Sequence, residues 1–406
     1  MKADREGQII PSKSTDRILD IDILRGFALF GVILVNIFYF QVPAAYFSTY
    51  YEQFSDLWNR SVVDILNWFF TGKFYPIFSF LFGLGFSIQF LSAKQKVTNP
   101  YIFLARRLVI LLLFGLAHII FVWEEDILFI YAIFGFVLLM LIEQSPKFIL
   151  AAAMILYFAS PIFDILNNFF NGAIDDPAAF NSISTYTTFY VNASYWQILQ
   201  ERVKIYVQNY NQPGEIISLL NRLAFFLMGL YSGKKNYITT FRDQPRYWFQ
   251  MLLISIGVFS VGFLIDKVWL KDLNTASSPT LILSLEEMIN SISNLFQVLV
   301  YIIGFLLLLT VNRIRPFLLP LANIGRTALT VYLTHTIVFS FLFYSFGLKL
   351  YASLVPTQLL VIALALFFVD VILSILWLKY FQYGPLEWVW RSLTYNKLLP
   401  LRKRTS

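Results

Sequence analysis

The sequence predicts an all-α integral membrane protein of about ten spanning helices, with both termini in the cytoplasm. Three observations predict it: an apolar composition, ten apolar runs of spanning length, and an uneven distribution of lysine and arginine. Of the 406 residues, 58% are hydrophobic and only 14% are charged, and the mean hydropathy is +0.66. Soluble domains are about 45–50% apolar and about 25% charged, so the composition argues against a soluble enzyme and against a disordered chain.

The ten apolar runs mark the spanning helices, because a helix needs roughly 20 mainly apolar residues to cross the hydrocarbon layer. The first run is interpreted as an uncleaved anchor, since it exceeds the apolar region of a signal peptide. Five runs form an N-terminal half, 23–166, and five form a C-terminal half, 218–382. The runs are 23–42, 68–91, 108–123, 127–143, 148–166, 218–232, 248–269, 292–311, 323–345 and 356–378.

The basic residues orient the helices. One side of the predicted membrane holds 23 of the Lys and Arg residues and the other side holds 6. Basic loops stay in the cytoplasm, so 1–22 is expected to be a cytoplasmic N-terminus and 383–406 a cytoplasmic interfacial tail. The net charge of +7 therefore indicates topology, and no nucleic-acid partner is expected. The predicted location is a bacterial cytoplasmic membrane, with the lipid bilayer as the main partner.

The segment 167–217 is the only long outer loop, and it is rich in Asn and Tyr. Helical spacing of its apolar residues predicts an amphipathic helix on the outer surface. The residues at this spacing are Trp196, Leu199, Val203, Tyr206 and Tyr210. Two interpretations remain: the aromatic and amide side chains bind a sugar, or the loop is an interfacial lid without a ligand.

A histidine at membrane depth is the strongest candidate for chemistry, because ionisable groups there are costly and usually functional. His118 lies 11 residues beyond Arg107, which places it about 16 Å into the membrane. Asp126 ends a short acidic turn, and it meets His118 only if the chain folds back at Glu124 and Glu125. His118 would then be a general base that Asp126 orients. The alternative is that His118 only joins neighbouring helices.

Other polar residues are candidates for binding a substrate. Asp22 and Arg25 lie three residues apart at the cytoplasmic end of the first helix, where they form either a structural ion pair or part of an anion site. Asn36 lies on the outer half of the same helix. The remaining candidates are Lys73 near the outer boundary, His335 at mid-depth, and Arg106, Arg107 and Arg326 on the inner side.

Several kinds of site are excluded by the composition. The absence of cysteine excludes thiol catalysis and zinc–thiolate sites, and two histidines exclude a multi-histidine metal site, so no metal is expected. No glycine-rich phosphate loop occurs. Glycines in two helices, Gly26, Gly31, Gly83 and Gly85, are expected to let helices approach closely.

Ordered motifs along the chain resemble the YeiB family, bacterial membrane proteins of the domain of unknown function 418. The stretch Arg17–Ala28 with Asn36 resembles the family's opening "LDxLRGxAL…N", and Phe78–Gly85 resembles "FSxLFGxG". The likeness continues through Arg106–His118, Asp126–Ala132, Gly325–Leu333 and Gly384–Arg391. The blocks keep their order over almost the whole chain.

This resemblance also implies an activity. The first helix is similar to the Arg-Gly helix of transmembrane acyltransferases, including lysosomal heparan-glucosaminide acetyltransferase. Those enzymes move acyl groups from cytoplasmic acyl-CoA across the membrane with an essential histidine, so the likeness implies acyl-CoA as donor. No histidine occurs between Asn36 and the second run, where the heparan enzyme would place its own, so His118 would have to serve instead from a different helix. Two departures stand out: Glu125 occupies a position that is usually Gly, and His335 one that is often Gln.

The leading hypothesis is a transmembrane acyltransferase that carries an acyl group to an envelope glycan or lipid acceptor. His118 would deprotonate the acceptor or carry the acyl group, with Asp126 orienting it and Asn36 donating to the oxyanion. Arg25, Arg106, Arg107 and Arg326 would hold the CoA phosphates. One alternative is a proton-coupled or solute transporter, with a path along His118, His335, Asp126, Asp370 and Lys73. Another is a structural or sensory protein whose polar residues lock helices together.

Overall fold

The computed structural model describes residues 19–43, 46–171, 179–209, 213–237, 241, 243–265 and 279–403. The expected N-terminal segment up to residue 18 and Tyr210 of the outer loop lie outside these residues. Every named element in the described residues is an α-helix. The helices are α1 (Leu19–Gln41), α2 (Phe47–Glu52), α3 (Leu57–Phe69), α4 (Phe74–Lys96), α5 (Pro100–Phe121), α6 (Leu128–Leu141), α7 (Pro146–Asn171), α8 (Ala179–Asn192), α9 (Tyr195–Asn209), α10 (Pro213–Lys234), α12 (Pro245–Leu264), α14 (Pro279–Leu308), α15 (Arg315–Arg326), α16 (Ala328–Phe343), α17 (Pro356–Tyr380) and α18 (Pro385–Tyr395).

The chain is an all-α membrane protein. Among the described residues, eight helical segments are long and apolar enough to cross a membrane, and the bent pair α15–α16 makes a ninth if it counts as one span. The remaining expected span, 127–143, is the 14-residue helix α6. At 1.5 Å per residue α6 is about 21 Å long, shorter than a hydrocarbon layer of about 30 Å.

Helix α5 begins earlier than the expected run 108–123. Asn99 caps it by accepting hydrogen bonds from the backbone N–H groups of Tyr101 and Ile102, and Pro100 occupies the first turn. Arg106 and Arg107 therefore lie inside the helix, where an apolar run did not place them. As a consequence, His118 lies in the last turn of α5, at the end opposite the Asn99 cap.

The expected continuous helix 323–345 is broken. Helix α15 ends at Arg326 and α16 starts at Ala328, with a bend of 77° between them. Glu387 of α18 supplies the reason: its Oε1 accepts from the backbone N–H groups of Leu329 and Thr330, and its Oε2 accepts from the Thr330 hydroxyl. The first turn of α16 is thus capped by a residue far along the chain instead of by a preceding helical turn.

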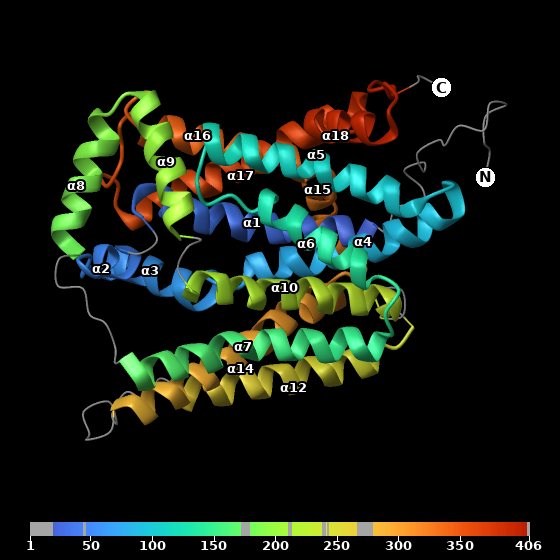
Figure 1. The fold of residues 1–406 in the computed structure, drawn as a ribbon, viewed down its shortest axis with the longest axis horizontal. Coiled ribbons are helices and arrows are strands. Elements are labelled where there is room, and N and C mark those ends of the chain that lie inside the picture. The colour runs from blue at the N-terminus through green and yellow to red at the C-terminus, as the bar shows by residue number, and fades with distance from the viewer. Residues whose placement is uncertain are drawn as a thin grey trace.

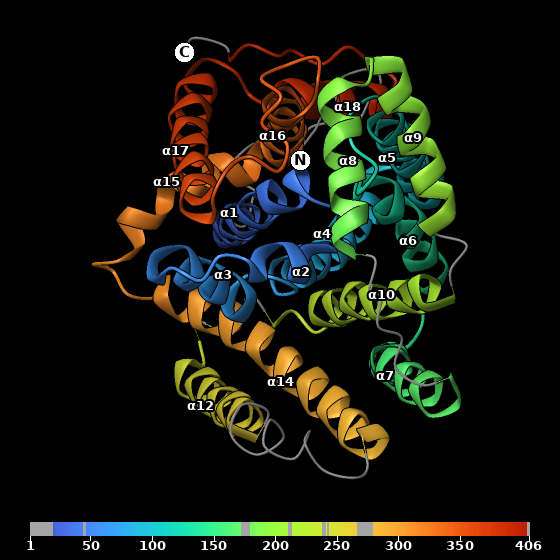
Figure 2. The same ribbon diagram turned by 90° about the vertical axis from the view of Figure 1, so that its left-hand side faces the viewer.

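Helix α1 lies at the centre of the bundle, among α4, α15, α16 and α17 (Figures 1 and 2). In an apolar 18-residue stretch of each spanning helix, 67% of α1 is buried inside the protein, against 17% of α17 and 6% of α12. The last two helices are therefore the ones whose apolar side chains face lipid. Helices α7, α12 and α14 form one edge of the molecule, beside α10 (Figure 1).

Two glycines bring α4 and α10 into backbone contact. A methyl group at Gly83 of α4 would lie 1.9 Å from the Phe226 carbonyl oxygen of α10, and one at Gly229 of α10 would lie 1.9 Å from that of Phe80. The expected packing role of Gly83 is confirmed. Gly85 differs, since a methyl group there would have only ordinary contacts, the nearest with Arg25 at 3.6 Å.

Loops that the sequence assigns to the cytoplasm meet at one end of the bundle. Lys94, at the end of α4, forms a 2.7 Å ion pair with Glu143 after α6. Lys234, at the end of α10, donates to the carbonyl oxygens of Ile142 and Gln144. We call this end the inner side, and the end that carries α8 and α9 the outer side.

Candidate functional site

A buried cluster of His118, Asp126 and Thr336, here called the His118 cluster, joins α5, the turn before α6, and α16. The His118 Nδ1 lies 2.8 Å from Asp126 Oδ1, and its Nε2 lies 2.8 Å from Thr336 Oγ1. The chain does fold back after His118, so the predicted pairing with Asp126 is confirmed. Asp126 Oδ2 also accepts from the backbone N–H of Phe129, which fixes the carboxylate at the start of α6.

Two proton arrangements satisfy this geometry. In one, the Thr336 hydroxyl donates to Nε2, and Nδ1–H donates to the Asp126 carboxylate, as when a carboxylate orients a general base. In the other, the Thr336 hydroxyl donates to the Leu333 carbonyl oxygen, 3.0 Å away, and Nε2–H donates to Thr336. In this second arrangement one further proton lies between His118 Nδ1 and the Asp126 carboxylate. All three side chains are at most 2% exposed.

Helix α9 closes the His118 cluster from the outer side. The Tyr195 hydroxyl and the Arg202 Nη1 both donate to the carbonyl oxygen of Phe121, at 2.9 and 3.2 Å. They cap the C-terminal end of α5, where unpaired carbonyls gather and a cation is favourable. Arg202 is fully buried, and its Nε lies 3.7 Å from Glu124 Oε2. The outer loop therefore covers the turn that carries Asp126.

A cavity of about 340 Å³, the inner cavity, opens on the inner side among α1, α4, α5, α15, α16 and α18. Its mouth is basic. Its deep part is apolar, with Phe78, Leu81, Phe82, Leu111 and Leu128 among its lining residues. The basic lining residues are Arg25, Lys96, Arg107, Arg326 and Arg391.

Contacts at the mouth hold several of these groups in place. Arg25 Nη1 donates to Asp22 Oδ1 at 2.9 Å, so this pair is an ion pair on the cavity wall. The Arg107 guanidinium lies 3.7 Å from the ring centroid of Trp390, whose Nε1–H donates to the Arg107 carbonyl oxygen. The tail helix α18 therefore forms one wall of the inner cavity instead of only anchoring the chain.

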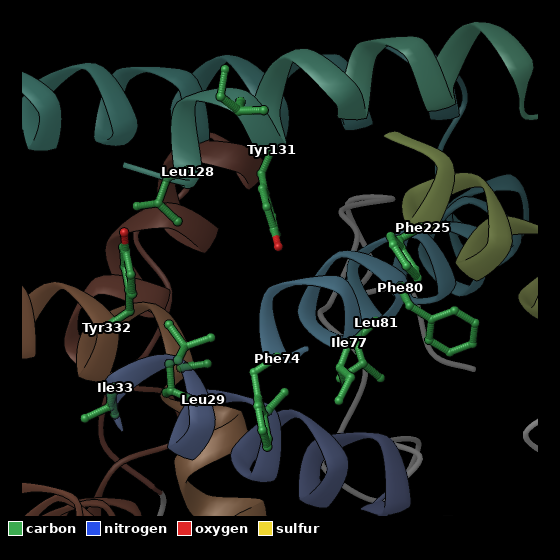
Figure 3. Close-up of a cluster of buried hydrophobic side chains, with 14 of the residues drawn as sticks. Leu29, Ile33, Phe74, Ile77, Phe80, Leu81, Leu128, Tyr131, Phe225 and Tyr332 are labelled. Carbon is green, nitrogen blue, oxygen red and sulfur yellow. The ribbon is translucent and has the colours of Figure 1, made fainter. Parts of the chain in front are cut away.

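Tyr332 separates the inner cavity from His118. Its ring lines the cavity and lies 5.5 Å from the His118 ring, and its hydroxyl is buried. Figure 3 shows Tyr332 pointing from α16 toward Leu128, with Tyr131 pointing from α6 toward α4. The Tyr131 hydroxyl lies 2.8 Å from Ser79 Oγ. His118 thus lies one side chain behind the cavity wall.

The structure brings some predicted site residues together and separates others. Asp22, Arg25, Arg107 and Arg326 share the inner cavity, whereas Arg106 reaches the Thr394 carbonyl on α18. Asn36 borders neither that cavity nor His118. Lys73 lies in a second cavity, and His335 pairs with Asp370 of α17 through Nε2 at 2.9 Å. The candidate residues are therefore divided among the inner cavity, the His118 cluster, the second cavity and the His335–Asp370 pair.

Sequence reasoning missed four residues of this region. Lys96 and Arg391 both line the inner cavity, although neither is among the predicted site residues. Tyr332 and Thr336 lie four residues apart on α16, one on the cavity wall and one on His118. Residues four apart lie on the same face of a helix. The sequence therefore contained a signal for Tyr332 and Thr336: two polar side chains on one helix face, close in sequence to His335.

Comparisons with known proteins identify the family. The family model described as protein of unknown function (DUF418) matches residues 232–397. The chain is 31% identical to the uncharacterized protein YxaH of Bacillus subtilis (strain 168), over 97% of this chain and 98% of that protein. It is 30% identical to an uncharacterized 39.9 kDa protein in the amylase 3' region of Bacillus acidopullulyticus, over 96% and 97%. It is 26% identical to the uncharacterized protein YeiB of Escherichia coli (strain K12), over 96% and 100%. The chain thus belongs to the YeiB family of DUF418 membrane proteins.

Proposed function

We propose that this protein is a transmembrane acyltransferase that binds acyl-CoA in the inner cavity. The single observation that carries the proposal is the combination of a basic mouth and an apolar interior in one cavity. A ligand that fits must carry anionic groups at one end and an apolar group at the other. Acyl-CoA has this chemistry, with its phosphates at one end and its acyl thioester at the other.

The mouth suits phosphate groups. Lys96 and Arg391 approach it from α4 and α18, and Arg25 and Arg326 from α1 and α15. Arginine binds phosphate through two parallel hydrogen bonds, and such charge-assisted bonds are stronger than neutral ones. The cytoplasmic location of this mouth follows from the lysine and arginine distribution of the sequence.

In the proposed reaction, the acyl group enters first and reaches Tyr332 at the deep end of the cavity. Displacement of Tyr332 connects the thioester with His118. The acceptor hydroxyl or amine then gives its proton to His118 and forms a bond to the acyl carbon, while the CoA sulfur leaves and takes up a proton. Asp126 orients the ring, and the acceptor is an envelope glycan or lipid. In this proposal Asn36 has no role at the reacting atoms, since nothing joins it to the His118 cluster.

A matched pair of lysines tests acyl-CoA binding. Lys94 and Lys96 both lie in the last turn of α4, but Lys96 lines the inner cavity while Lys94 pairs with Glu143. In calorimetric titrations of the purified protein with acetyl-CoA, Lys96→Ala is expected to weaken binding about tenfold and Lys94→Ala about twofold or less. Higher salt is expected to weaken the wild type more than Lys96→Ala.

Acyl transfer itself needs a second measurement. Radiolabelled acetyl-CoA is incubated with membranes that contain the wild type or His118→Gln, and label in glycan and lipid fractions is counted. Transfer by the wild type that His118→Gln abolishes supports the proposal. Acetyl-CoA that neither binds nor transfers its label would refute it.

A solute transporter is the second candidate, and one observation favours it. A second cavity lies in a different group of helices and shares no lining residue with the inner cavity. Transporters bind their substrates between groups of membrane helices, as a cavity among α3, α7, α10, α12 and α14 would allow. Solute flux into proteoliposomes that does not depend on CoA would favour this candidate over the acyltransferase.

A further inference from the structure

A second cavity of about 330 Å³, the outer cavity, lies where the turn between α3 and α4 meets α7, α10, α12 and α14. Figure 2 shows α14 passing between α3 and α12 at this junction. Ligand sites favour such junctions between helices of a bundle. Nothing in the proposed acyltransferase activity uses this cavity.

Carboxamides dominate its lining. Three lie on α14 at Asn290, Asn294 and Gln297, a spacing that places them on one face of the helix. Asn67 of α3 and Asn221 of α10 add two more from other walls. A polar face on a membrane helix is costly against lipid, so it indicates a water-filled or ligand-filled space.

Hydrogen bonds between the walls hold the outer cavity in shape. Gln297 Nε2 donates to the Trp68 carbonyl oxygen at 2.8 Å, and the Tyr157 hydroxyl donates to that of Ser291 at 2.6 Å. Asn221 Nδ2 donates to the Tyr157 carbonyl oxygen at 3.2 Å. Two polar atoms remain: the buried Oδ1 of Asn294 and Oγ of Ser293 have no hydrogen-bond partner among the described residues.

The charged and aromatic residues narrow the class of ligand. The lining holds one cation, Lys73, and one anion, Glu287, so the cavity favours a ligand without net charge. Trp68 and Phe263 also line it, with ring centroids 5.8 Å apart in an edge-to-face arrangement. They offer apolar faces beside the carboxamides.

The helix ends nearest the outer cavity belong to loops that the sequence assigns to the outer side. The C-terminal ends of α3, α7 and α12 and the N-terminal ends of α4, α10 and α14 all belong to loops that carry few basic residues. The positive-inside rule places these loops outside.

We propose that the outer cavity binds a neutral polyhydroxylated molecule, such as one sugar unit. Each hydroxyl group both donates and accepts, and each carboxamide does the same, so the two sets pair without a buried charge. The C–H face of a sugar ring packs on aromatic side chains such as Trp68. The proposal does not depend on the proposed acyltransferase function, because the two cavities use different residues.

The test is calorimetric titration of the full-length protein in lipid nanodiscs, in a buffer without glycerol, since a polyol would compete. The probes are D-glucose and N-acetyl-D-glucosamine as neutral sugars, glycine betaine as a zwitterion, and glucose 6-phosphate as an anion. Asn294→Ala and Asn67→Ala are each expected to weaken binding of the neutral sugar about three- to tenfold. The control is Asn192→Ala on α8, whose amide donates to the Thr188 carbonyl outside the cavity.

Saturable binding of a neutral sugar that both cavity variants weaken, and that Asn192→Ala leaves unchanged, supports the proposal. The exposed position of Asn67 keeps the test valid if Asn294→Ala does not fold. Binding of glycine betaine or glucose 6-phosphate in place of the sugars, no binding of either sugar, or equal weakening by Asn192→Ala would overturn it. Acetyl-CoA titrated into the same samples separates this result from the proposed acyltransferase function, since the cavity variants are expected to leave its binding unchanged.

Discussion

His118 and His335 are each held by an aspartate, yet their surroundings differ. His335 Nδ1–H donates to the Val331 carbonyl of its own helix at 2.9 Å, and Asp370 lies on the lipid-facing helix α17. This geometry suits a link between α16 and α17. His118 instead bridges three segments of the chain and lies directly behind the wall of the inner cavity. Of the two histidines, His118 is therefore the one that a bound ligand can reach through a single side-chain movement.

Tyr332→Ala is expected to expose His118 to water from the inner cavity, because the Tyr332 ring lines the cavity and lies beside the His118 ring. The measurement is the rate at which diethylpyrocarbonate modifies histidine, followed by peptide mass analysis. In the wild type both histidines are at most 4% exposed, so slow modification is expected. In Tyr332→Ala, His118 is expected to react at a rate close to that of an exposed imidazole.

Two further variants control this experiment. Tyr332→Phe keeps the ring and is expected to leave His118 protected. The double variant Tyr332→Ala with His118→Gln is expected to lose the fast reaction. Fast modification of His335 instead of His118 would show that the substitution loosened the fold and did not open the wall.

At the scale of the elements, the tail helix α18 decides the shape of the inner cavity. Its Glu387 caps α16, its Trp390 stacks on Arg107, and its Arg391 lies at the cavity mouth. The break between α15 and α16 and the basic mouth therefore depend on one short helix. A chain truncated before α18 is expected to lose both.

The cap at Glu387 predicts a pH dependence of stability. Burial raises the pKa of Glu387, so the folded protein holds this proton more tightly than the unfolded chain does. The resulting stabilisation is complete below the unfolded-state pKa of about 4.3 and is lost as the pH rises through the higher folded-state pKa. Over that range the unfolding temperature of the wild type is expected to fall relative to that of Glu387→Gln. The exposed Glu52→Gln serves as the control and is expected to follow the wild type.

Glycine at the crossing of α4 and α10 predicts a second effect on stability. Gly83→Ala places a methyl group against the backbone carbonyl of Phe226, and a backbone atom yields only if the helices move apart. The expected loss in the free energy of unfolding is about 1–3 kcal/mol, measured by denaturant titration in micelles.

Gly257→Ala on α12 is the matched control, because nothing lies within 4 Å of its added methyl group. It is expected to be neutral or to stabilise by up to about 1 kcal/mol, as alanine does in helices. Equal losses in the two variants would contradict the close-contact explanation.

At the scale of the whole molecule, the two cavities and the α8–α9 cap give the bundle two different faces. The inner face carries the basic mouth, and the outer face carries the cap over the His118 cluster and the amide-lined cavity. The chain has no cysteine, so single cysteines can report which face meets the cytoplasm.

Two single-cysteine variants test this orientation. Gln95→Cys lies in the last turn of α4 on the inner side, and Asn192→Cys lies at the end of α8 on the outer side; both positions are exposed. A membrane-impermeant maleimide added to right-side-out vesicles is expected to label Asn192→Cys, and in inside-out vesicles it is expected to label Gln95→Cys. The reverse pattern would place the basic mouth outside and remove access to cytoplasmic acyl-CoA.

The sequence alone predicted most of the helices and the loops that meet at the inner side. It also brought His118 and Asp126 together, although only as one of two interpretations. The amphipathic helix expected in the outer loop is confirmed as α9, but α8 and α3 were not predicted. Those helices lie beside the spans, where the requirement for about 20 apolar residues does not apply.

The sequence by itself determined that this protein is an all-α membrane protein, because an apolar run in lipid can satisfy its backbone hydrogen bonds within itself only as a helix. The ordered motifs determined its likeness to the YeiB family. Tertiary structure alone decided which polar residues share a site. Thr336 reaches His118 across 218 positions of sequence, and Glu387 reaches α16 across 57 to 58. Such contacts depend on which faces of distant helices meet, and no spacing along the chain contains that information.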